Sequence, residues 1–149
     1  MTLAERITQD LQAARKSGDA AKRQVLGMAQ AALTNARIAK KIDQLPDPDA
    51  ISVLGKEAKS RRDAAVEFRK GGAEERAQAE ESEAKILETY LPAQLSDAEI
   101  EKVVTGTLAK LGISDVKQMG KVMGVLSKEL RGKADLKKVN ALVKSKLGA

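Results

Sequence analysis

Helix-capping residues and glycines recur along this chain and divide it into short segments, each with one apolar stripe. Thr2 with Glu5, and Ser96 with Glu99, match the capping box in which a Ser or Thr and a Glu satisfy the free amides at a helix start. Glycines such as Gly18 and Gly112 follow the last apolar residue of a segment, where helices commonly end. The spacing therefore predicts a chain built from short helices.

Seven helices are predicted. The second is capped by Asp19, and the third by Asp47 with Pro48 at the first helical position. The third ends at Gly71–Gly72, and the fourth ends near Pro92, which cannot easily continue a helix. Ser96 is predicted to cap the fifth helix, and Asp135 is predicted to cap the seventh. The sixth helix is capped by either Ser114 or Asp115.

Composition agrees with this all-α fold class. Phe68 and Tyr90 are the only aromatic residues, and the chain lacks the aromatic and β-branched runs that strands need. Its abundant Ala, Leu, Lys and Glu favour helices. With Pro92 as the boundary, we expect a four-helix domain over residues 1–92 and a three-helix domain over residues 93–149.

Missing residue types restrict the chemistry. The chain has no Cys and no His, which removes thiolate catalysis, disulfides and the commonest general base and metal ligands. It has no phosphate-binding loop and no motif of a serine or zinc hydrolase. We therefore expect no catalytic residues, no metal, no cofactor and no enzyme activity, although a site among Asp and Glu residues stays open.

The same residues give an expectation for the compartment. The N-terminus reads as a helix start rather than as an apolar signal segment. No apolar run approaches the roughly 18 residues that a membrane span needs. We expect a cytoplasmic protein with no membrane partner.

The net charge of +6 is unevenly distributed. After Pro92, 11 basic residues stand against 6 acidic ones, whereas the longer first part is nearly neutral. Such asymmetry indicates an anionic partner for the second half, or else a lysine-rich surface that serves solubility.

One block in the sixth predicted helix is unusual because it places two glycines, Gly120 and Gly124, inside the helix. Each interior glycine costs about 1 kcal/mol relative to Ala. Gly124 points away from the apolar side formed by Met119, Met123, Leu126 and Leu130, whereas Gly120 lies at its border. Close helix packing explains Gly120 but fits Gly124 poorly, so an exposed helical backbone that a sugar-phosphate strand can approach is the second interpretation.

Basic residues surround this block. The predicted nucleic-acid-binding residues lie in the sixth helix, the following turn and the last helix: Lys117, Gly120, Lys121, Gly124, Lys128, Arg131, Lys133, Lys137 and Lys138. This half has no aromatic residue on which bases could stack. Binding would therefore use phosphate and sugar and would read shape more than sequence.

Two charged residues interrupt apolar stripes in the first half. Arg61 falls within the stripe of the third helix, and Glu80 falls within that of the fourth. We predict that Arg61 and Glu80 form a partly buried ion pair that sets helix register. Arg62, at the edge of the stripe, is the candidate for a secondary anion site.

Several motifs together resemble a known family. The following residues occur in this order over essentially the whole chain: Lys59-x-Arg61-Arg62, Glu80, Tyr90-Leu91-Pro92-x-Gln94-Leu95, Met119-Gly120-Lys121-Val122-Met123-Gly124, Ala134-Asp135 and Val139-Asn140. They resemble the YqeY proteins of the GatB/YqeY family. The C-terminal half is similar to the tail domain of GatB, a subunit of tRNA-dependent amidotransferases.

This resemblance implies a role with tRNA. The GatB tail is expected to hold the outer body of the tRNA, near the D arm, while other parts of that enzyme amidate Glu-tRNA(Gln) or Asp-tRNA(Asn). The family label, a carbon–nitrogen ligase with glutamine as amido-N-donor, describes that larger assembly. We therefore expect a non-catalytic accessory protein of translation that binds tRNA and has a protein partner there. The alternative is a protein–protein adaptor that acts through the N-terminal helices.

Overall fold

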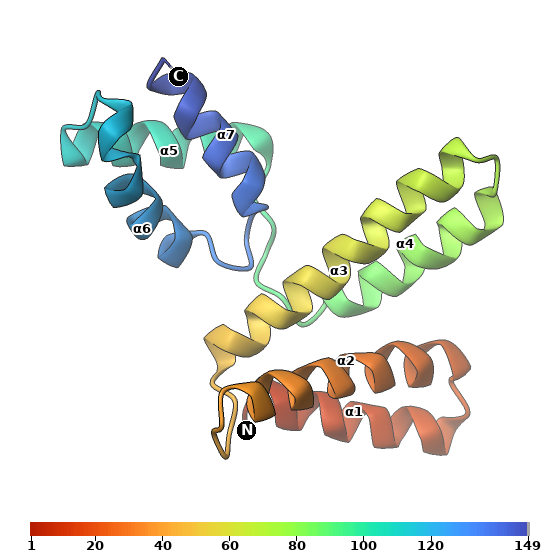
Figure 1. Ribbon diagram of the computed structural model, residues 1–149. Coiled ribbons are helices and arrows are strands. Elements are labelled where there is room, and N and C mark those ends of the chain that lie inside the picture. The colour runs from red at the N-terminus through yellow and green to blue at the C-terminus, as the bar shows by residue number, and fades with distance from the viewer. Residues whose placement is uncertain (149) are drawn as a thin grey trace. The chain divides into compact units, whose positions relative to one another are not determined.

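The computed structural model describes residues 1–148, and this part of the chain contains only helices, turns and loops (Figure 1). The predicted all-α fold class is confirmed. In chain order the elements are α1 (Leu3–Ser17), α2 (Ala20–Ala39), α3 (Asp47–Lys70), α4 (Glu74–Glu88), α5 (Asp97–Leu111), the 3-10 turn η1 (Val116–Gln118), α6 (Met119–Glu129) and α7 (Leu136–Lys146).

The chain divides into two compact units. The N-terminal unit, Met1–Leu91, holds α1 to α4, and the C-terminal unit begins at Pro92 and holds α5 to α7. Each unit has a hydrophobic core of its own.

Local capping explains where most of these helices begin and end. The Thr2 side chain accepts from the Glu5 amide while the Glu5 carboxylate accepts from the Thr2 amide, as predicted. Asp19 caps α2, and Gly18 (φ 75°) takes the left-handed conformation that ends α1. Asp135 caps α7. These confirmed caps depend on residues at most a few positions apart, which sequence alone resolves.

The start of α3 differs from the prediction. Pro46 occupies the N-cap position, and Asp47 is already helical, so the prediction that Asp47 caps this helix is wrong. The Asp47 carboxylate instead accepts a hydrogen bond of 2.8 Å from the Leu3 amide at the start of α1. A backbone amide at the start of one helix, which has no partner within that helix, thus donates to a carboxylate of another helix.

In the N-terminal unit, α1 pairs with α2 and α3 pairs with α4 as antiparallel hairpins (Figure 1). Their core joins buried aliphatic and alanine side chains from all four helices and the α2–α3 loop, among them Ile7, Leu26, Leu45, Leu54 and Leu87. Tyr90 packs at its edge and donates from its hydroxyl to the Asp10 carboxylate at 2.5 Å.

The C-terminal unit is a three-helix arrangement around Val104, Val122, Leu126 and Val139. The predicted sixth helix is split here. Asp115 caps the turn η1, and α6 begins only at Met119, so Gly120 lies in the first turn of α6 rather than inside a longer helix. Val122, which was left out of the predicted apolar side, is fully buried.

Candidate nucleic-acid interface

The predicted binding residues of the C-terminal unit are all exposed. They lie on η1, on α6, in the α6–α7 turn and at the start of α7. We call these residues together the basic surface: Lys117, Gly120, Lys121, Gly124, Lys128, Arg131, Lys133, Lys137 and Lys138. On α6, Lys121, Gly124 and Lys128 recur at intervals of three and four residues, which places them on one side of the helix.

The cations of the basic surface make no ion pair with any residue among 1–148. Arginines of the N-terminal unit behave differently, since Arg61, Arg62 and Arg69 each contact carboxylates of α4. In the C-terminal unit Lys146 pairs with Glu101 at 3.1 Å, outside the basic surface. The positive charge of the basic surface is therefore available to an external anion.

Helix dipoles add to this charge. The first turns of α1, α3, α4 and α5 carry Asp or Glu, as the positive end of a helix favours. The first turns of α6 and α7 carry no acidic residue and instead hold Lys121, Lys137 and Lys138. Each such lysine is disfavoured by about 0.3–1 kcal/mol. Helix stability thus does not explain their placement.

The two glycines of the α6 block face open space. A Cβ atom added to Gly120 or Gly124 would meet nothing within 4 Å. The interpretation that Gly120 allows close packing against another helix of this chain is therefore wrong. Both positions expose helical backbone beside lysines, as the second interpretation of the block requires.

The turn that carries Arg131 and Lys133 is held by the segment before α5. The Gln94 side-chain amide donates to the Gly132 carbonyl at 2.5 Å, and the Leu95 amide donates to the Lys133 carbonyl at 2.9 Å. These bonds join residues nearly forty positions apart in sequence. They fix the backbone of the α6–α7 turn and so position its cations.

Arg61 is buried between helices of the N-terminal unit, with 8% of its surface exposed. Its guanidinium forms its closest ion pair with Glu83 and lies 3.8 Å from the predicted partner, Glu80. A second nitrogen contacts the Met28 sulfur at 3.4 Å. The predicted Arg61–Glu80 ion pair is therefore confirmed, and Glu83, about one helical turn beyond Glu80, is a second and closer partner that the prediction missed.

Arg62, the predicted secondary anion site, already has a carboxylate partner. Its guanidinium contacts both carboxylate oxygens of Glu88, at 2.5 and 2.8 Å. Hydrogen bonding to Glu88 raises the pKa of Arg62. A carboxylate of α4 already occupies the fork of this exposed guanidinium, so an external anion would have to displace Glu88, and the secondary anion site stays a prediction.

Comparison with protein families gives one result that covers both units. The family model described as "Yqey-like protein" matches residues 4–147. The chain belongs to this Yqey-like family. Comparison with curated proteins gives no significant match.

The motif that ends α4 has a structural role in this Yqey-like chain. Burial and the hydrogen bond to Asp10 both raise the pKa of the Tyr90 hydroxyl, so it stays a donor at neutral pH. The guanidinium of Arg6 lies 4.8 Å from the centre of the ring. Tyr90 therefore fastens the end of α4 to α1 and contributes nothing to the basic surface.

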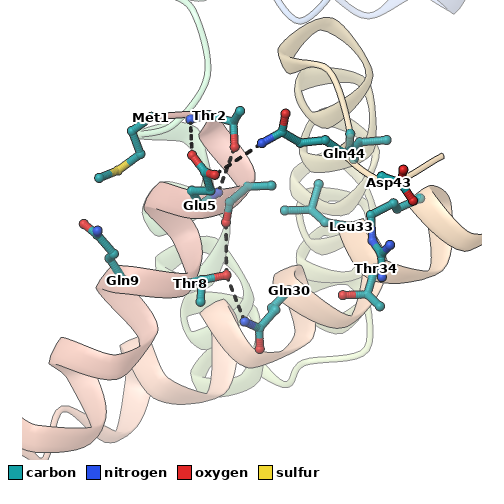
Figure 2. Close-up of a pocket in the computed structure, with 13 residues that line it drawn as sticks. Met1, Thr2, Glu5, Thr8, Gln9, Gln30, Leu33, Thr34, Asp43 and Gln44 are labelled. Carbon is teal, nitrogen blue, oxygen red and sulfur yellow. Dashed lines mark hydrogen bonds between the residues drawn. The ribbon is translucent and has the colours of Figure 1, made fainter.

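A groove of about 580 Å³ lies between α1, α2 and the α2–α3 loop (Figure 2). Its polar groups are largely bonded to one another, with Gln30 donating to Thr8 at 3.0 Å and Gln44 donating to Glu5 at 3.3 Å. Hydrogen bonds from Thr2 hold the pKa of Glu5 below its usual value, so this carboxylate is anionic and serves the α1 cap. Nothing in this lining resembles an acid–base pair.

Two further features of the described residues bear on function. They contain no cluster of three or more Asp and Glu side chains that could hold a metal ion. None of the helices in residues 1–148 is both long and apolar enough to cross a membrane.

Sequence reasoning missed one feature of α5. Lys102, Gly106 and Lys110 recur every four residues on an exposed side of this helix, and Gly106 also faces open space. The spacing i, i+4, i+8 was visible in the sequence. As at Gly124 on α6, a helical glycine that faces open space lies between two lysines on the same side of its helix.

Proposed function

We propose that this chain is a non-catalytic accessory protein of translation that binds folded tRNA through the basic surface. The proposal treats residues 1–92 and 93–149 as two domains, with the second similar in role to the tail domain of GatB. The amidotransferase label of that larger assembly is not assigned to this chain. The cytoplasm, where tRNA is used, is the proposed compartment.

One observation carries the proposal: exposed cations without ion pairs lie beside helical backbone with no side chain in the way. Lysines that only keep a protein soluble do not require open glycines next to them. Exposed lysines beside open helical backbone suit a phosphodiester strand, because its charged oxygens attract cations and the open backbone allows close approach. The C-terminal unit has no aromatic residue, so contacts to phosphate and sugar are expected rather than base stacking.

The test is a binding titration with the full chain and labelled, unfractionated tRNA. Changing Lys121 and Lys128 together to Glu should weaken binding at least about tenfold, because two favourable phosphate contacts become repulsive. A matched control changes Lys56 and Lys85, two exposed lysines of the N-terminal unit, to Glu and so alters the net charge equally. Helicity from far-UV circular dichroism should match the parent protein in both variants.

Salt dependence separates this proposal from the adaptor alternative. For the parent chain, the logarithm of the binding constant should fall linearly with the logarithm of salt, with a slope of about −0.7 to −0.9 for each phosphate contacted. Equal affinity of the Lys121/Lys128 variant and the control variant would contradict the proposed surface.

A protein adaptor is the second candidate. Met28, Ile38 and Val66 of α2 and α3 are exposed by 50%, 61% and 49%. Exposed apolar side chains of this size favour a helical or extended protein segment over RNA. Binding of such a partner should change little with added salt and should be unaffected by the Lys121 and Lys128 changes.

A further inference from the structure

The N-terminal unit is nearly neutral as a whole, but its charge is strongly segregated. From Leu11 to Ile42 the only acidic residue is Asp19, whereas the acidic residues of this unit are concentrated on α3 and α4. Four cations flank Asp19 at the turn between α1 and α2. We call this group the hairpin tip: Arg15, Lys16, Lys22 and Arg23.

We propose that the hairpin tip is a second contact surface for the phosphates of RNA. The inference rests on the proposed function for the identity of the ligand, but on different residues in a different unit. Figure 1 shows the tip as the tight turn at the end of the α1–α2 hairpin farthest from the N-terminus.

The four cations of the hairpin tip are exposed and make no ion pair within residues 1–148. Asp19, the nearest acid, accepts a hydrogen bond from the Lys22 amide as the cap of α2. Elsewhere in the same unit, Lys40, Lys59, Arg61, Arg62, Arg69 and Lys70 all contact carboxylates. The tip differs in that its four cations without an ion pair adjoin one turn, whereas other cations of this unit that lack an ion pair in the described residues, such as Lys41, Lys56 and Lys85, are spread along the chain.

Helix stability accounts for only half of the tip. Arg15 and Lys16 occupy the last turn of α1, where the helix dipole favours cations. Lys22 and Arg23 occupy the first turn of α2, where the dipole disfavours them and where no acidic residue is present. This is the arrangement seen in α6 and α7, whose first-turn lysines belong to the basic surface.

The turn is also rigid without help from these side chains. The amides of Gly18 and Asp19 both donate to the Ala14 carbonyl, and the Ser17 hydroxyl donates to the same oxygen at 3.3 Å. The cations are therefore not needed to cap α1. Two helix ends present them from a fixed backbone.

RNA suits the tip better than a membrane or a protein. Between Leu11 and Val25 no apolar side chain is larger than Ala, and no residue is aromatic. A membrane-surface helix needs large apolar residues to insert, and protein interfaces depend on aromatic and apolar anchors. Phosphate contact needs only charge and access.

The test again uses the full chain and labelled, unfractionated tRNA, titrated over a range of salt concentrations. The tip variant carries Arg15→Gln, Lys16→Gln, Lys22→Gln and Arg23→Gln. A matched control carries Gln at four exposed lysines of the same unit, so that the loss of charge is equal: Lys41, Lys56, Lys70 and Lys85. Far-UV circular dichroism should show parent-like helicity for both, since every changed side chain is exposed.

We expect the tip variant to bind tRNA at least about fivefold more weakly than the control variant does. The slope of the logarithm of its binding constant against the logarithm of salt concentration should be smaller in magnitude by about 2. Equal affinity and slope would overturn the inference. Binding of the parent to vesicles of phosphatidylserine and phosphatidylcholine that is lost in the tip variant, with tRNA affinity unchanged, would also overturn it in favour of a membrane surface.

The Lys121/Lys128 variant in the same assay separates the two proposals. If it binds weakly while the tip variant matches its control, the hairpin tip is excluded and the proposed function stands. If only the tip variant binds weakly, the tip is supported and the basic surface fails. If the parent chain does not bind tRNA at all, both proposals fail.

Discussion

At the scale of single residues, Gly124 shows how a position can be costly for its helix and still be open. It lies in the middle of α6, is exposed, and has no neighbour within 4 Å of an added Cβ atom. A glycine retained for packing would have such a neighbour. Its conformational cost of about 1 kcal/mol relative to Ala therefore has no packing benefit within the chain.

We expect Gly124→Leu to leave thermal stability unchanged or raised, because Leu is the better helix former and enters open space. The same change should weaken tRNA binding at least about fivefold, since the side chain blocks close approach of a strand. Gly124→Ala should give a similar stability with a smaller loss of binding. Thermal unfolding followed by far-UV circular dichroism checks the first statement, and a sharp drop in melting temperature would show that Gly124 packs against another helix.

At the scale of elements, a buried charge cluster joins α3 to α4. Arg61 contacts Glu83 and, more distantly, Glu80, while its Nε is buried without a partner in the described residues. A buried cation that loses its partner retains its desolvation cost, whereas replacing both partners by apolar groups removes it. The cluster therefore restricts how α3 and α4 can pair more than it stabilises them.

We predict that Arg61→Met and Glu83→Leu each destabilise the N-terminal unit by about 2–3 kcal/mol, and that the double variant recovers much of the loss. Glu80→Leu should destabilise the unit by less, because the Glu80 carboxylate lies 3.8 Å from the Arg61 guanidinium, farther than that of Glu83. Urea unfolding followed by Tyr90 fluorescence reports this unit alone, since Tyr90 is the only tyrosine and the chain has no Trp. The exposed Arg62–Glu88 pair is the control, with an expected coupling of about 1 kcal/mol or less. Additive effects at Arg61 and Glu83 would contradict the cluster.

At the scale of the whole molecule, a hydrogen bond in each unit ties the stretch between α4 and α5 to a distant part of that same unit. In the N-terminal unit, Tyr90 donates to Asp10 across a separation of 80 residues. In the C-terminal unit, Gln94 donates to the Gly132 carbonyl. Both donors lie in the motif between α4 and α5, so this short stretch completes one unit and positions the basic turn of the other.

Tyr90 makes the first of these contacts sensitive to alkali. Its pKa is raised in the folded chain, so the stability that it contributes is fully present below the ordinary tyrosine pKa of about 10 and is lost as pH rises through the folded-state value. We expect the absorbance titration of this tyrosine to have its midpoint above the ordinary value. Asp10→Asn should move the midpoint down, because the carboxylate acceptor is gone while burial remains. An ordinary midpoint in the folded parent chain would contradict the buried contact.

The helical class, the positions of most helix ends and the exposure of the lysines could be predicted from the sequence. These features depend on residues within a few positions of one another: a cap and the amide two or three residues later, or an apolar stripe repeating every three to four residues. For the same reason the spacing of Lys102, Gly106 and Lys110 could have been found from sequence.

Which charged side chains are already paired within the chain depends, in contrast, on how the helices pack. Arg62 looked free but meets Glu88, which is 26 residues away, and Asp47 serves the Leu3 amide, which is 44 residues away. Arg61 pairs with both Glu80 and Glu83 of α4 and lies closer to Glu83. Such pairings depend on how helices meet and on how far side chains reach, and several carboxylates on one helix satisfy the same sequence pattern. The lysines of the basic surface remain unpaired because no carboxylate of the described chain lies within ion-pairing distance of them.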